Sequence, residues 1–176
     1  MSRRFVLSMF ILALATIGCE RGDLRDSAPE PETPPSTEQT DSLFDEPITP
    51  DQPNSVQQRI AALLAGHWRG ELTSEYIDEK GVTHTASCTS DLRLELFEAG
   101  AVNGKGKETD YNGEKQVYMM PFNWYVDVDG HLHMKFADNR LMASTALEVD
   151  ETQLICRLRS SDTMEINEFK LIKVRE

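Results

Sequence analysis

The chain has 176 residues and a formal net charge of −12, because 30 acidic residues outweigh 18 basic ones. Such an acidic chain repels phosphate backbones and anionic head groups, so the charge argues against nucleic acid as a partner. Seven of the eight prolines fall before residue 54. The remaining stretch of about 120 residues is long enough for one domain and too short for two.

The N-terminus has the features of an export signal. Arg3 and Arg4 precede an apolar run over residues 5–17, which has the length of a signal-peptide core and is too short to span a bilayer. Residues 15–19 (Ala-Thr-Ile-Gly-Cys) resemble the lipobox of bacterial lipoproteins. The resemblance implies a signal peptide over residues 1–18, acylation of the Cys19 thiol, and anchoring of the chain to a membrane through that lipid.

The residue after the cysteine bears on location. Glu20 stands where lipoproteins retained in the inner membrane most often have Asp. We therefore expect a cell-envelope protein in the outer membrane, on either its periplasmic or its surface side. An ordinary secretory signal with a chance cysteine is the alternative interpretation.

Residues 19–53 differ in composition from everything that follows. They carry a net charge of −8 and the seven prolines, with Leu43, Phe44 and Ile48 among their few bulky apolar residues. A segment of this kind buries too little apolar surface to offset its ordering entropy. The sequence predicts a disordered, extended linker before a folded domain over residues 54–176.

The domain begins with a short helical pattern. Asn54 and Ser55 are typical of a helix N-cap, Val56, Ile60, Leu63 and Leu64 share one helical face, and Gly66 is a stop signal. Beyond it the apolar period changes from 3.6 to 2, with strong hairpin signals at Asn112-Gly113 and Asp129-Gly130. About eight short antiparallel strands result. A sheet of this kind must protect its two edges, so an all-β, up-and-down closed barrel is expected, with an open or half-rolled sheet as the alternative.

The start of the first strand carries a family resemblance. Gly66-His67-Trp68 after the helix resembles the G-x-W signature of lipocalins. In that family the tryptophan closes one end of the barrel, and an arginine from the last strand packs over it. The resemblance implies barrel closure by Gly66, Trp68 and Arg175, with Lys173 as the second candidate.

Two cysteines lie in the domain. Cys88 and Cys156 are both on apolar faces of predicted strands, in a chain expected to be exported. An even pair in an oxidising compartment predicts a disulfide. Two buried free thiols are the alternative.

Metal and catalytic motifs are weak. His131 and His133 lie two apart on one strand face and could share a metal ion, but without a nearby carboxylate or thiol they are a poor zinc site, and a solvated outer face is favoured. Asp127 and Asp129 before Gly130 are explained by a hairpin turn. No nucleophile motif or phosphate loop is evident. We therefore expect no metal, no cofactor and no enzymatic activity.

The functional prediction is a monomeric binding protein whose barrel holds a small apolar or amphipathic ligand. Its candidate lining residues are bulky inward positions with a polar side chain at the rim: Trp68, Phe122, Trp124, Met134 and Phe136, with Tyr76 or Tyr118. The alternative is that these side chains are the core of an envelope protein-interaction module, an inhibitor or an assembly factor. Residues 64–69 are similar to the opening of bacterial periplasmic metalloprotease inhibitors, which are small lipocalin-like barrels.

Overall fold

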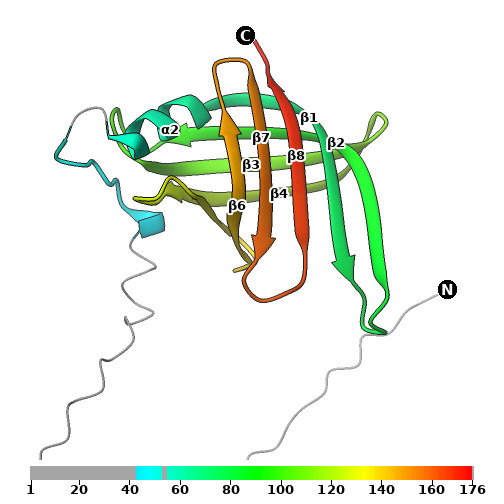
Figure 1. Ribbon diagram of the computed structural model, residues 1–176. Coiled ribbons are helices and arrows are strands. Elements are labelled where there is room, and N and C mark those ends of the chain that lie inside the picture. Colours follow the sequence, from blue (N-terminus) through cyan, green and yellow to red (C-terminus); the bar gives the residue numbers. More distant parts are fainter. Residues whose placement is uncertain (1–42, 53–54, 176) are drawn as a thin grey trace, which may run out of the picture. The chain divides into compact units, whose positions relative to one another are not determined.

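A computed structural model describes residues 43–52 and 55–175. The signal peptide, Cys19 and the linker up to residue 42 lie outside the described residues. A short helical turn at residues 43–45 and the helix α2 (Val56–Leu64) precede eight strands: β1 (Gly66–Ile77), β2 (Thr83–Leu96), β3 (Asn103–Asn112), β4 (Lys115–Val126), β5 (Leu132–Phe136), β6 (Leu141–Val149), β7 (Gln153–Ser160) and β8 (Ile166–Lys173) (Figure 1).

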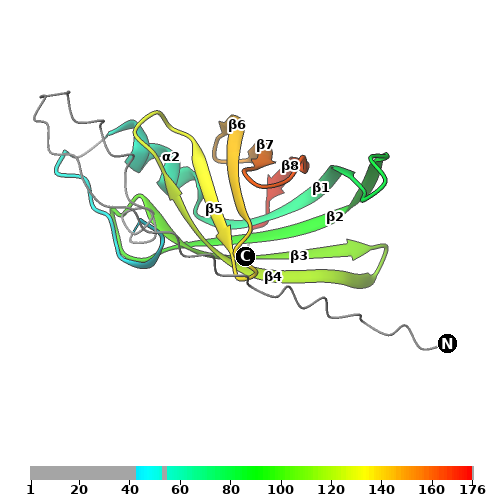
Figure 2. The same cartoon turned by 90° about the horizontal axis from the view of Figure 1, so that it is seen from below.

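The strands form a closed barrel in sequence order. Each pairs antiparallel with the next, and β1 closes the ring on β8, with Trp68 opposite Lys173 and Leu72 opposite Phe169. The predicted up-and-down barrel with a short helix before its first strand is therefore confirmed, and the open sheet is excluded. The helical turn at residues 43–45 was not predicted. Figure 2 shows β1–β4 reaching furthest from the helix, because these strands are the longest. Within the described residues, no helix is long and apolar enough to cross a membrane.

The helix begins where the sequence predicts. The Ser55 side chain accepts a hydrogen bond from the Gln58 backbone N–H at 3.2 Å, which satisfies one of the free donors of the first turn. Ala61 and Leu64 are buried, whereas Val56 is 64% exposed. The helix therefore faces the barrel through a narrower face than the predicted one.

Residues 43–52 correct the predicted domain boundary, because they pack on the barrel instead of belonging to a free linker. Phe44 is buried, with its ring edge-on to Tyr125 at a centroid distance of 5.0 Å. Asn103 holds this segment: its Oδ1 accepts from the Ile48 N–H at 2.8 Å, and its Nδ2 donates to the Leu43 carbonyl at 3.0 Å. The folded unit therefore already includes Leu43. The apolar side chains of Phe44 and Ile48 and the buried amide of Asn103 hold this segment on the barrel despite its polar composition.

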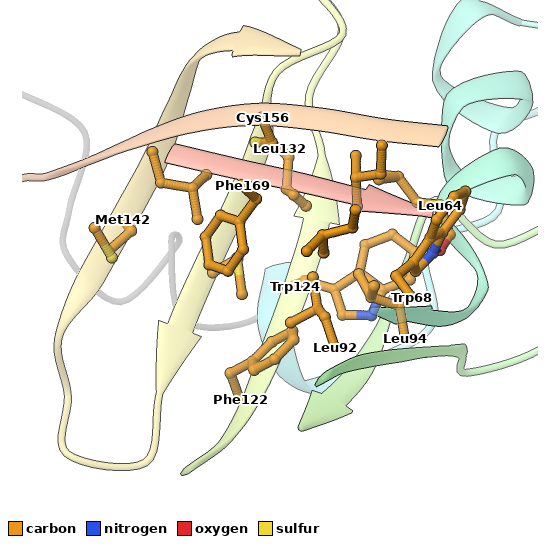
Figure 3. Close-up of a cluster of buried hydrophobic side chains, with 14 of the residues drawn as sticks. Leu64, Trp68, Leu92, Leu94, Phe122, Trp124, Leu132, Met142, Cys156 and Phe169 are labelled. Atoms are coloured by element: carbon orange, nitrogen blue, oxygen red, sulfur yellow. The ribbon is translucent and has the colours of Figure 1, made fainter. Parts of the chain in front are cut away.

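The interior is one apolar cluster that extends from α2 to the middle of the barrel (Figure 3). Its largest side chains are Trp68, Trp124, Phe136 and Phe169, each at most 2% exposed. The indole N–H of Trp124 donates to the Lys105 carbonyl at 3.0 Å, so burial leaves no indole donor unpaired. This cluster supplies the main stabilisation of the barrel.

The predicted Cys88–Cys156 disulfide is wrong, because both thiols are free. The register across the sheet runs Cys88–Leu72–Phe169–Cys156, so two strands separate the cysteines. Three strand spacings amount to about 14 Å along the sheet, whereas a disulfide needs Cα atoms within about 7 Å. Burial raises the pKa of the Cys156 thiol to about 12 and that of Cys88 to about 11, so both stay protonated.

Gly106 on β3 leaves room for the Phe122 ring of the neighbouring strand β4. A Cβ added at Gly106 would lie 2.3 Å from the Phe122 ring and 2.7 Å from the Arg93 carbonyl oxygen. We expect Gly106→Ala to lower the free energy of unfolding by about 1–3 kcal/mol, because the ring and the strand must both shift. Urea unfolding measures this. Lys107→Ala on the exposed face of the same strand is the control, and an equal loss in both variants would contradict the steric explanation.

Candidate functional site

The end of the barrel beside α2 is sealed. Trp68 is fully buried, and its indole N–H donates to the Leu64 carbonyl at 2.7 Å, which ties the ring to the end of the helix. Lys173 Nζ lies 4.8 Å from the centre of this ring and donates to the Leu63 carbonyl at 3.3 Å. Arg175, the predicted closing residue, is exposed. The cation over the tryptophan is therefore Lys173, the last residue of β8.

The predicted aromatic lining residues belong to the core. Trp68, Phe122, Trp124, Met134 and Phe136 are each at most 3% exposed and are members of the same buried cluster. Phe122 and Phe136 contact each other with a centroid distance of 5.4 Å. These side chains fill the space that a ligand among them would need.

The two tyrosines lie at the opposite end, which is open. Tyr76 is 44% exposed and stacks on His84 at a centroid distance of 5.3 Å. By strand alternation from Leu72, Tyr76 is in the inward row of β1, and both its partner His84 and the next inward residue of β2, Ala86, are exposed as well. Inward side chains that remain exposed mark this end as the mouth of the barrel.

Four buried polar side chains lie between the mouth and the apolar core. Ser90, Glu108, Asp110 and Asn167 are 0%, 3%, 7% and 4% exposed. Ser90 pairs with Asp110 across β2 and β3, and Asp110 pairs with Tyr118 across β3 and β4. We call these four side chains the polar floor.

Three oxygen atoms of the polar floor have no hydrogen-bond partner among the described residues: Ser90 Oγ, Asp110 Oδ1 and Asn167 Oδ1. The Asn167 amide group does donate to Glu165 Oε1, at 3.1 Å. Buried polar atoms are nearly always paired in folded proteins, so a cluster of unpaired oxygens is unusual. The Ser90 hydroxyl can donate one hydrogen bond to Asp110 beside it, but further lone pairs of the three oxygens lack a donor, so the floor still has a surplus of acceptor capacity.

Arg140 joins three elements beside the floor. Its Nη1 donates to Glu165 Oε1 at 2.9 Å and its Nη2 to the Tyr118 hydroxyl at 2.6 Å. The guanidinium carbon also lies 4.5 Å from the centre of the Phe136 ring. The guanidinium thus connects β4 to the residues just before β6 and β8 at the mouth.

Burial changes the charge of the floor. Burial, with a further contribution from the Asp110 charge, raises the pKa of Glu108 to about 8, and Arg140 offsets only part of this rise. Burial also raises the pKa of Asp110, although a hydrogen bond with the Ser90 side chain and the charge of Arg140 lower it in part. The two carboxyls are therefore a coupled pair that retains a proton at neutral pH.

A separate polar group lies in the exposed turn between β4 and β5. Ligand atoms of Asp127, Asp129 and His131 lie within 4.8 Å of one another, which is a spacing that a metal ion could use. Asp127 is already engaged, however: Oδ1 accepts two backbone N–H groups of the turn, and Oδ2 lies 2.8 Å from His133 Nε2. Although burial opposes it, the hydrogen bond from His133 lowers the pKa of Asp127. The turn itself accounts for this arrangement.

Sequence reasoning missed the polar floor. Gly104, Gly106, Glu108 and Asp110 alternate on the inner face of β3, opposite exposed Lys105 and Lys107. The alternation was readable in the sequence, but its inward face lacks bulky apolar residues. Two acids at inward positions of a barrel strand are the signal that identifies the site.

Comparisons with known proteins add little to this description. No family model and no curated protein matches the chain. Among solved structures, the chain is similar to a redesigned beta barrel at 15% sequence identity. That alignment covers 67% of this chain and 96% of the designed chain, with a TM-score of 0.41.

Proposed function

We propose that the chain is a non-enzymatic lipoprotein of the cell envelope, anchored through Cys19, whose barrel binds a small amphipathic molecule at its open end. The observation that supports ligand binding is the asymmetry of the barrel. One end is sealed by Trp68 and Lys173, and the other leads past exposed inward side chains to a polar floor with unpaired oxygens. A buried surplus of acceptors is costly unless a partner satisfies it.

The packing of the core supports an amphipathic ligand over a wholly apolar one. A wholly apolar molecule among the aromatic side chains is disfavoured, because those side chains pack against one another. A ligand with a polar group can place that group on the floor and leave its apolar part at the mouth, beside Tyr76 and Ala86. An amphipathic ligand therefore fits better than an apolar one.

A protein-interaction role is the second candidate. The outer face of β4 exposes Val117 and Met119, which are 55% and 52% exposed and lie on the extended part of the strand near the mouth. Neighbouring exposed apolar side chains of this kind are typical of a surface that contacts another protein. The partner would be an envelope protein, and the barrel core would then serve only as a scaffold.

Native mass spectrometry of the full chain, purified in a non-ionic detergent from the cells that make it, separates the two functions. Ligand binding predicts a reproducible extra mass of small-molecule size that is lost on denaturation. A bare protein mass together with a stoichiometric co-purified protein would contradict ligand binding and support the interaction role.

The anchor has its own test. We expect Cys19→Ser to move the exported chain from the membrane fraction to the soluble fraction, because the substitution removes the thiol that carries the lipid. Fractionation followed by immunoblotting measures this, with Cys88→Ser as the matched control. Membrane retention of the Cys19→Ser chain would contradict lipid anchoring.

A further inference from the structure

We propose that the polar floor binds a protonated primary amine, with its N–H groups donating to Asp110, Ser90 and Glu108. This inference rests on the proposed ligand-binding function of the open end and names the chemical class that the end recognises. Hydrogen-bonding capacity and charge each support the inference, and two other kinds of cation fit the floor less well.

The first argument is hydrogen-bonding capacity. Ser90 and Asp110 are buried, paired residues of neighbouring strands. The Ser90 hydroxyl has a single proton to donate to Asp110, so lone pairs on both side chains remain without a donor among the described residues. No hydrogen bond joins the Glu108 side chain to another described residue either. An ammonium group has three N–H donors and no acceptor, so it complements a cluster of unpaired acceptors. A ligand that brought further acceptors would leave the floor unsatisfied.

The second argument is charge. The titratable groups that face the floor are Glu108 and Asp110 from β3, Tyr118 from β4, Cys88 from β2, and Arg140, Asp138 and Glu165 from the segments just before β6 and β8. Among these groups Arg140 is the single cation. It is already paired with Glu165 at 2.9 Å and lies 3.7 Å from Asp138. The Arg140 charge offsets only part of the rise in the pKa of the two carboxyls, and its unpaired Nε makes no hydrogen bond to them. The Glu108–Asp110 pair therefore lacks a cation in direct contact, and an ammonium supplies one.

The third argument excludes two other kinds of cation. A quaternary ammonium has no N–H donor, so it would leave the unpaired oxygens of the floor without a hydrogen bond. A calcium ion takes about six to eight oxygen ligands. The floor offers two carboxyls, one hydroxyl and one amide oxygen, and Arg140 lies beside them. A group with directed N–H donors is the better match.

The test uses three small probes on the full chain, purified in a non-ionic detergent at pH 7 and constant ionic strength. Butylammonium carries charge and N–H donors, tetramethylammonium carries charge alone, and butanol carries neither. Their dissociation constants follow from chemical-shift titration of the isotope-labelled protein. We expect butylammonium to bind most tightly and to shift the backbone signals of Ser90 and Asp110.

Matched variants locate the site. Asp110→Asn is expected to weaken butylammonium binding about tenfold or more, because it removes a buried hydrogen bond to a charged group. Ser90→Ala is a smaller, uncharged change and serves as the second variant in case Asp110→Asn does not fold. It is expected to weaken butylammonium binding several-fold. Glu148→Gln, at an exposed position on β6, is the control and is expected to leave binding unchanged.

Equal binding of tetramethylammonium and butylammonium would overturn the inference, as would unchanged affinity in both floor variants. If butylammonium does not bind but native mass spectrometry finds a retained molecule without an amine, the amine inference fails while the proposed function stands. If neither a probe nor a retained molecule is found, both fail.

Discussion

Glu108→Gln is expected to remove most of the pH dependence of stability between about pH 5 and pH 8. Glu108 has its pKa raised from 4.5 to about 8 by burial, so the folded chain retains a proton that the unfolded chain releases. Stability is therefore highest below the unfolded pKa and falls as the pH rises through the folded one. The whole loss is on the order of 5 kcal/mol, of which about 3–4 kcal/mol falls between pH 5 and pH 8, and Asp110 adds to it with the same sign.

Urea unfolding at a series of pH values tests this prediction. The unsubstituted chain should lose stability steadily toward pH 8, and Glu108→Gln should follow a much flatter profile. Glu148→Gln, which removes an exposed carboxylate, should keep the original slope. If the Glu108→Gln chain retained the full slope, the buried proton would have to be assigned to another group.

Trp68→Ala is expected to be the most damaging single change at the sealed end, with a loss of about 3–5 kcal/mol in the free energy of unfolding. It removes a fully buried ring, the hydrogen bond to Leu64 and the surface on which Lys173 lies. Trp68→Phe keeps most of the apolar contact and loses the N–H bond, so it should cost about 1–2 kcal/mol.

Thermal and urea unfolding of the two variants, compared with the unsubstituted chain, measure the difference. An alanine variant as stable as the phenylalanine variant would mean that the indole packs loosely and that α2 alone closes this end of the barrel.

The sequence predicts the barrel well because its signals are local. Alternation of apolar residues identifies the strands, and pairs such as Asn112-Gly113 identify the turns, so the strand order follows from short hairpins. Trp68 at the closed end was likewise readable from its position after the helix. These features depend on near neighbours in the chain.

The failures of prediction all depend on distant contacts. The count of two cysteines gives no information on register, and Leu72 and Phe169 separate Cys88 from Cys156 in the folded sheet. Phe44 has a polar sequence context, and only its contact with Tyr125 reveals its place in the fold. The inward alternation of Glu108 and Asp110 was readable in the sequence, but the pairing of Asp110 with Ser90, which lies far from it in the chain, was not.

The pairing of β1 with β8 has a consequence for how the fold opens. A sheet closed into a ring has no terminal strand that can fray from an edge. Backbone amides in the middle of all eight strands should then exchange their hydrogens with solvent through one common cooperative opening, with similar protection factors around the ring. Backbone amides at the ends of the long hairpins should exchange faster. The middle of the barrel would then be rigid, whereas the residues around its mouth would be mobile.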